Sequence, residues 1–189
     1  MNYGIIDNLP IDYQFSTKSK KELELYGEWF YENKDKRIYE LFRAVSSTVG
    51  FEGWISDFTS NSLKELGTWL KQNVEIEKIP DDDYKKKRAE IPDYMELKDW
   101  DLTNKTRSLL VDIGIYFGEV FIHTYSQLNW EQYFSTRKKD NDQGHMVIKM
   151  SNNILNPIWI TYIIGLGLAD NIKDRFCLIN SFETWKKYI

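Results

Sequence analysis

The stretch 101–127, DLTNKTRSLLVDIGIYFGEVFIHTYSQ, constrains the fold of this chain more than any other. Nearly every position from Leu109 to Ile122 is apolar, which predicts one long helix that is buried on most sides. Asp101 and Thr103 are both suitable residues for its N-cap. A helix buried in this way is expected at the centre of the domain, with the other elements packed around it.

Four polar residues interrupt the apolar surface of this helix: Asp112, Tyr116, Glu119 and His123. At about 100° per residue they fall within roughly 60° of one another and form one stripe. Gly114 and Gly118 lie on the opposite side, where the absence of a side chain lets another element approach closely. Buried carboxylates and a buried imidazole need partners, so the stripe is the first candidate functional site.

Composition and charge narrow the class of protein. A chain of 189 residues with 42% hydrophobic and 15% aromatic residues suits one globular domain with a substantial core. The net charge of -4 argues against nucleic acid as a partner. Cys177 is the only cysteine, which excludes an internal disulfide and argues against a cysteine-based zinc site.

The expected compartment is the cytosol. The N-terminal residues, MNYGIIDNLP, have neither the basic start nor the apolar core of a secretory signal. The longest apolar run, Ile158 to Leu168, is too short to span a bilayer, so no membrane association is expected.

The N-terminal part of the chain contains two similar segments. Residues 63–73, LKELGTWLKQN, match residues 23–33, LELYGEWFYEN, so a strand–cap–helix unit occurs at 11–33 and again at 54–73. Short strands are expected at 11–15 and 54–58. Two copies are too few for a solenoid. The helices are expected to pack alike, with each glycine allowing close contact and each tryptophan filling core; the alternative is a pseudo-symmetric groove with paired tryptophan walls.

Further helices are expected on both sides of the central one. Ser19 followed by Glu22 is a capping-box pattern that begins the first helix, and a separate helix is expected over 36–49. A cap followed by a first-turn proline, Asn156-Pro157, begins a helix over 158–169 that is apolar on all sides and should be buried. The last helix is expected within 174–188.

The segment 74–101 has a different character. It contains the acidic run Asp81, Asp82 and Asp83, then Tyr84, a basic run from Lys85 to Arg88, and two prolines. Opposite charge runs this close together predict a solvated, flexible connection, and the alternative is a mobile lid over the neighbouring helix. If the protein binds a partner, contacts are expected at the three aspartates and Tyr84, with Tyr94 nearby.

The pattern changes period after the central helix. Residues 130–135 and 145–150 each resemble a strand, and the polar loop TRKKDNDQG joins them into a hairpin. Together these patterns predict a single α+β domain over residues 1–189, mostly helical, with a long central helix and a small antiparallel sheet.

Three motifs together resemble a pattern in small uncharacterised bacterial proteins. They are DIGIYFGEV from Asp112, LNWE from Leu128, and LNP from Leu155. In that group the helix has the form D-x-G-x-Y-x-G-E-V and is followed by L-x-W-E and L-N-P. The resemblance implies a common fold and no particular activity. This chain departs from the pattern at His123, where the group is expected to have a basic or variable residue. By analogy of class, small acidic proteins of this kind are similar to the immunity proteins found beside bacterial toxins.

The chemistry of the stripe leaves alternatives open. Glu119 and His123 are spaced to give two ligands of one metal ion, but Asp112 lies about 10 Å further along the helix axis. A general acid–base pair of Glu119 with Asp112 or His123 is a second alternative, although no nucleophile accompanies it. The principal expectation is structural, with the carboxylates paired to Arg43, Arg107, Arg175 or backbone N–H groups. No catalytic residue, metal or cofactor is assigned.

Two functional classes therefore remain. The first is a non-enzymatic bacterial protein that binds another protein, in the manner of an immunity protein. The second is a small enzyme, or a ligand or metal binder, that uses the stripe of Asp112, Glu119 and His123. A binding protein should expose aromatic residues such as Trp54, Trp100 or Tyr94 beside carboxylates, whereas an enzyme should have a pocket with Glu119 at its floor.

Overall fold

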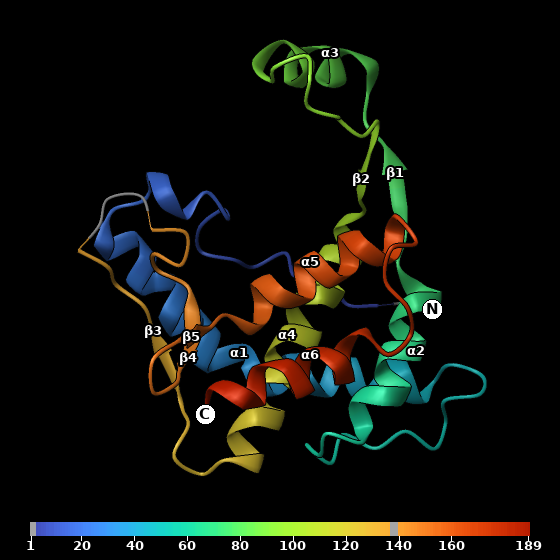
Figure 1. Ribbon diagram of the computed structural model, residues 1–189, viewed down its shortest axis with the longest axis vertical. Helices are drawn as coiled ribbons and strands as arrows, with labels where there is room; N and C mark the ends of the chain where they lie inside the picture. Colours follow the sequence, from blue (N-terminus) through green and yellow to red (C-terminus); the bar gives the residue numbers. More distant parts are fainter. Residues whose placement is uncertain (1–2, 137–139) are drawn as a thin grey trace.

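The computed structural model describes residues 3–136 and 140–189, and within them it shows a mostly helical α+β fold (Figure 1). The helices are α1 (Lys20–Ser46), α2 (Ser62–Asn73), α3 (Asp81–Glu90), α4 (Asn104–Thr124), α5 (Pro157–Ala169) and α6 (Cys177–Trp185). The strands are β1 (Ile76–Lys78), β2 (Trp100–Leu102), β3 (Trp130–Gln132), β4 (Met146–Lys149) and β5 (Ile154–Leu155). Both sheets, β1–β2 and β3–β4–β5, are antiparallel, so the predicted fold class is confirmed.

Helix α4 is the centre of the fold, as the apolar run predicts. Every residue from Ser108 to Phe121 is buried, and α4 packs chiefly against α5 and α1. The helix begins at Thr103, whose side chain accepts a hydrogen bond from the backbone N–H of Thr106. No helix among the described residues combines the length and the apolar character that crossing a membrane requires.

Two glycines allow close packing on α4. A Cβ atom added to Gly114 would lie 2.7 Å from the Cα atom of Ile158 in α5. One added to Gly118 would overlap the indole ring of Trp130 in β3. The expectation that these glycines admit neighbouring elements is therefore confirmed, and α5 and β3 are the elements concerned.

The N-terminal part differs from its prediction in two ways. Residues 20–46 form one continuous helix instead of two, because the junction contains no glycine or proline and the Asn33 side chain donates to the backbone oxygen of Trp29 within the helix. The predicted strands at 11–15 and 54–58 are also absent, and Phe15–Thr17 is a single 3-10 turn. The predicted capping box of Ser19 and Glu22 is present.

The similar segments of α1 and α2 share local features but contact different parts of the chain, since Gly27 faces the Gln132 side chain and Gly67 faces the Arg175 backbone. Trp29 and Trp69 are both buried, and Asn33 and Asn73 each donate a 2.8 Å hydrogen bond to the backbone oxygen of the preceding tryptophan. The tryptophans fill core and do not face each other across an open groove.

The segment predicted as a connection folds into an arm, defined here as residues 75–102. Strands β1 and β2 form a two-stranded ribbon with Ile76 opposite Leu102, and α3 lies at its far end (Figure 1). Figure 1 shows this ribbon and helix projecting away from the other helices. No residue of α3 is buried.

The C-terminal part confirms the hairpin and corrects one expectation. Strands β3 and β4 pair as predicted, and β5 adds a short third strand. Helix α5 begins at Asn156, whose side chain accepts from the backbone N–H of Trp159 at 3.0 Å. The prediction that α5 is buried on all sides is wrong, since Trp159 is 52% exposed and Ile163 is 42% exposed. Helices α4 and α6 cover only part of its circumference.

The contact between α4 and α5 gives a first testable prediction. Gly114→Ala should destabilise the protein by about 1–3 kcal/mol, because the new methyl group requires α5 to move. Gly53→Ala is the matched control, since no heavy atom lies within 4 Å of the added Cβ, and its free energy of unfolding should change by less than about 0.5 kcal/mol. Urea denaturation of both variants measures the difference, and equal stabilities would contradict the close packing.

Candidate functional site

Asp112 is fully buried and is held by three donors from the N-terminal part of the chain. The Arg37 side chain in α1 donates from Nε to Oδ1 at 2.8 Å and from Nη2 to Oδ2 at 2.6 Å. The hydroxyl of Tyr3 also donates to Oδ2. A carboxylate that receives both arms of a guanidinium group in this way has a fixed orientation, so Asp112 fixes the position of α1 against α4.

The charge of Asp112 depends on this neighbourhood. Burial raises the pKa of Asp112 to about 6, and the hydrogen bonds from Arg37 and Tyr3 oppose that rise. Burial, followed by the nearby carboxylate, raises the pKa of Tyr3 well above its usual value, so the phenol remains a donor. Near neutral pH the cluster is therefore an ion pair of Asp112 and Arg37 with one neutral phenol.

Glu119 is 6% exposed and has a different set of partners. Its Oε1 atom accepts from the Lys34 ammonium group of α1 at 3.1 Å and from the Trp130 indole of β3 at 2.9 Å. His123 lies at the surface, where its ring stacks on Phe58 with centroids 4.3 Å apart. Its Nδ1 atom lies 2.9 Å from the backbone oxygen of Glu119 and 3.7 Å from the carboxylate.

Tyr116 attaches the loop before α2 to α4. Its hydroxyl group lies 2.7 Å from the Ser62 hydroxyl and accepts from the backbone N–H of Phe58 at 3.2 Å. Burial raises the pKa of Tyr116 to about 12, so the side chain is neutral. This position is a structural contact with no free reactive group.

The stripe is one line on the helix but not one site. Asp112, Tyr116 and Glu119 each have a separate set of partners, although Asp112 and Glu119 both bind side chains of α1. Together they attach α1, the N-terminal segment, β3 and the start of α2 to α4. The predicted cationic partners Arg43, Arg107 and Arg175 are wrong, and Lys34 and Arg37 take their place. Within the described ranges no group of three or more His, Cys, Asp or Glu residues is placed to hold a metal ion.

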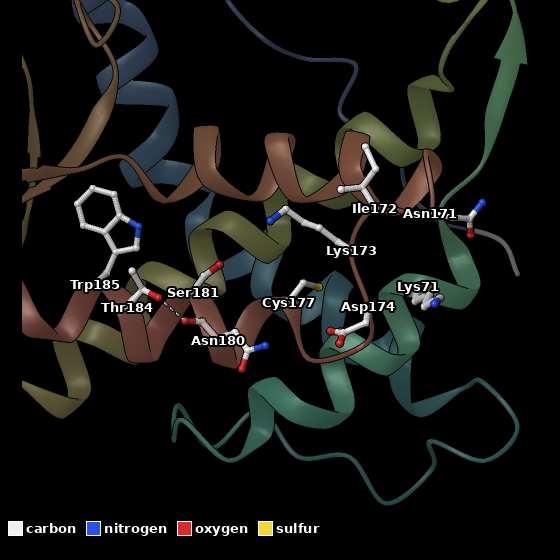
Figure 2. A pocket seen from close by; sticks show the side chains of 10 residues that line it. All are labelled: Lys71, Asn171, Ile172, Lys173, Asp174, Cys177, Asn180, Ser181, Thr184 and Trp185. Carbon is white, nitrogen blue, oxygen red and sulfur yellow. Dashed lines mark hydrogen bonds between the residues drawn. The ribbon is translucent and has the colours of Figure 1, made fainter.

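Two cavities lie elsewhere in the structure. The first, of about 500 Å³, lies beside α6 and the α5–α6 loop, and Figure 2 shows Lys71, Lys173, Asp174 and Cys177 among its lining residues. Burial raises the pKa of the Cys177 thiol to about 11, so this cavity contains no thiolate nucleophile. The second, of about 920 Å³, lies between α4, α5 and the segment 13–16. Glu119 and Asp112 line neither of these two cavities.

The arm carries the acidic candidates. Asp81, Asp82 and Asp83 form the first turn of α3, with side chains 76%, 90% and 57% exposed. Each is close to a lysine: Lys78 at 2.8 Å, Lys85 at 4.0 Å and Lys86 at 3.7 Å, respectively. Exposed pairs of this kind contribute little to stability. The carboxylates do favour helix formation at this end of α3, where the backbone N–H groups are unpaired.

The aromatic residues named by the sequence lie in different environments. Tyr94 is 88% exposed at the far end of the arm, and Met95 beside it is 50% exposed. Trp100 is half-buried at the end of the ribbon that is nearer α3, and Tyr84 donates to the backbone oxygen of Leu97 at 3.4 Å. Trp54 is buried, so the expectation that it belongs to an exposed surface is wrong.

The far end of the arm has internal order without a core. The Arg88 guanidinium group donates to the backbone oxygens of Met95 and Ile91, each at 2.7 Å, and to that of Pro92. These bonds fold the segment after α3 back onto the end of the helix. The Arg88 side chain therefore connects the loop that presents Tyr94 to the end of α3.

Comparison of the chain with protein families, with curated proteins and with solved structures finds no match, so its function has to be inferred from its own geometry.

The buried ion pair gives a prediction with a defined pH dependence. Arg37→Met should cost about 3–5 kcal/mol near neutral pH, because it leaves the Asp112 carboxylate buried without a cation. In the native protein the pKa of Asp112 is raised from 3.8 to about 6, so its contribution to stability falls as the pH rises from about 4 to 6 and is then constant. Without Arg37 the pKa rises further, and the variant should keep losing stability above pH 6, by up to about 1.4 kcal/mol per pH unit.

Urea denaturation of both proteins between pH 5 and pH 8 measures this difference. The control is the double variant Arg37→Met/Asp112→Asn, in which the extra pH dependence should disappear because no titrating carboxyl remains. If Arg37→Met loses the same free energy of unfolding at every pH, Asp112 is not the group that causes the loss.

The arm gives a third prediction, which also concerns stability. Lys78 and Trp100 face each other in the β ribbon, so residues 79–99 can be replaced by an Asn-Gly turn that keeps the strands paired. The free energy of unfolding should change by less than about 2 kcal/mol, because Ile79 is the only buried residue in the replaced stretch and it lies outside the main core cluster. Leu102→Ala, at the fully buried base of the ribbon, should cost about 2–5 kcal/mol. Thermal melts compare the shortened chain with Leu102→Ala. If the shortened chain is unfolded, the arm is not separable from the rest of the protein, hereafter the body.

Proposed function

We propose that this protein acts by binding another protein, and that the arm is its contact surface. The specific form of the proposal is a cytosolic bacterial protein that neutralises a partner such as a toxin. The observation that carries the proposal is the arm itself, a projecting, internally ordered segment whose helix contains no buried residue.

The distribution of charge supports this role. The arm contains ten acidic and six basic residues, a net charge of -4. The rest of the chain contains 19 of each and is neutral, so the arm carries the whole net charge of the protein. A local excess of one sign on a projecting element speeds association with a partner of the opposite sign. The partner is therefore expected to present a basic surface.

The arm also has a suitable anchor. Tyr94 and Met95 are exposed side by side, and Asp93 and Glu96 flank them. Interfaces of proteins commonly combine an aromatic or methionine anchor with a polar rim. Because Arg88 holds this loop by three backbone carbonyls, binding would cost little ordering of the loop.

A photo-crosslinking experiment in the native host tests the proposal. A photoreactive amino acid at position 94 should give one discrete protein adduct, whereas the same group at Val49 should not. Val49 is the matched control because it is 90% exposed and lies outside the arm. The shortened chain with residues 79–99 replaced should fail to compete for the adduct.

The contribution of the acidic charge to binding is measured with the partner protein that the crosslink identifies. Replacing the three aspartates with asparagine should lower the association rate constant and its salt dependence more than it raises the dissociation rate constant. Circular dichroism of the variant controls for any loss of α3, since the aspartates also favour the start of that helix.

Identical adducts from positions 94 and 49, or none from position 94, would overturn the proposal.

A further inference from the structure

The cavity of about 920 Å³ is formed by parts of the chain that are far apart in the sequence. Its walls come from the segment 13–16, from α4, from the loop 140–145 and from α5. A volume of this size is within the range of small-molecule sites. None of the contacts of the stripe or of the arm explains why the chain leaves this space open.

Two stacked aromatic pairs line the cavity from different sides. Tyr13 and Phe15 have ring centroids 5.9 Å apart with an angle of 24° between the rings. Trp159 and Tyr162 of α5 have centroids 5.5 Å apart, also at 24°. Trp159 and Tyr13 are about half exposed, at 52% and 47%, although both line a hollow. Flat apolar faces that border a cavity favour a flat apolar ligand, because stacking removes both surfaces from water.

The His145 side chain is a polar group of the cavity that is available to bind a ligand. The His145 ring packs against Phe15 with centroids 4.4 Å apart, and no side chain in the described part of the protein hydrogen-bonds to its nitrogens. Burial lowers the pKa of His145, so the imidazole is neutral near pH 7 and offers one donor and one acceptor.

The charged groups at the cavity already have partners within the protein. Arg107 donates from Nε to the backbone oxygen of Leu102 at 3.0 Å and pairs with Asp101. Asp142 accepts from the Asn156 side chain at 2.8 Å, and Asp140 accepts from the Tyr133 hydroxyl and from the backbone N–H of Asp142. A charged ligand would therefore meet groups whose charge is already engaged within the protein, whereas an uncharged ligand does not depend on them.

We propose that this cavity binds a small, planar, uncharged fused-ring heterocycle, which contacts the two aromatic pairs and forms a hydrogen bond between a ring nitrogen and His145. The proposed ligand class is that of indoles and purines, whose faces are apolar and whose edges carry nitrogen donors or acceptors. The site is distinct from the arm, so the protein could bind a small molecule and a protein partner separately.

A titration monitored by NMR tests this proposal with three probes: indole, adenine and benzoate. Indole and adenine should shift the indole N–H signal of Trp159 and the imidazole signals of His145 at sub-millimolar to millimolar concentrations. Benzoate, which is flat but anionic, should bind more weakly. The shortened chain lacking residues 79–99 should bind indole as the full chain does, which separates this proposal from the function of the arm.

Three variants assign the binding to the cavity. Trp159→Ala should weaken binding of indole about tenfold or more by removing a stacking face. His145→Phe keeps a ring against Phe15 and should weaken binding about fivefold by removing the hydrogen bond. Ile163→Ala is the matched control, because this residue is similarly exposed on α5 but does not line the cavity, and its affinity should be unchanged.

The outcomes that would overturn the proposal are distinct from a failure to fold. Thermal melting of Trp159→Ala should match that of Ile163→Ala, since both side chains are exposed. Absence of binding by indole and adenine at several millimolar, or equal affinity of the three variants, would show that the cavity is not the site. Tighter binding of benzoate, lost in Arg107→Ala, would show that the ligand class is wrong.

Discussion

The structure depends on the neutralisation of two carboxylates that lie on a buried helix. Asp112 and Glu119 are inside the core on α4, and a buried carboxylate is tolerated only with a cation and hydrogen-bond donors beside it. Helix α1 supplies both cations, Arg37 and Lys34, so it must lie antiparallel to α4 and in one register. The Trp130 indole donates to the same Glu119 carboxylate and thereby attaches strand β3 to α4.

This arrangement divides the molecule into two parts with different physical roles. The body buries its apolar residues around α4 and carries equal numbers of acidic and basic residues. The arm buries few of its side chains and carries the excess acidic charge. Its shape is stabilised by backbone hydrogen bonds and by the bonds from the Arg88 side chain to backbone oxygens. The residues that form the core and the residues that carry the excess charge are thus separate sets.

Local patterns in the sequence predicted the elements well and the long-range contacts poorly. The apolar run of α4, the Asn156-Pro157 helix start and the period of the hairpin are properties of neighbouring residues, and all three are confirmed. Arg37 and Lys34 were missed because 75 and 85 residues separate them from their partners, and no local rule selects one cation over another. The charge runs of the arm predict a solvated connection because the two strands that flank them are only three residues long. The cavity unites Tyr13, His145 and Trp159, which have no common motif.

The pairing of Ile76 with Leu102 has an evolutionary consequence. The arm is connected to the body by two adjacent, paired strands. The positions at which the chain leaves and re-enters the body are therefore the same whatever segment lies between the strands. Between Lys78 and Trp100 only Ile79 is buried, it lies outside the main core cluster, and this stretch takes no part in the ion pairs on α4. The arm can therefore change in length and sequence more freely than the body, and homologues would be recognisable by the buried helices long after their arms had ceased to align.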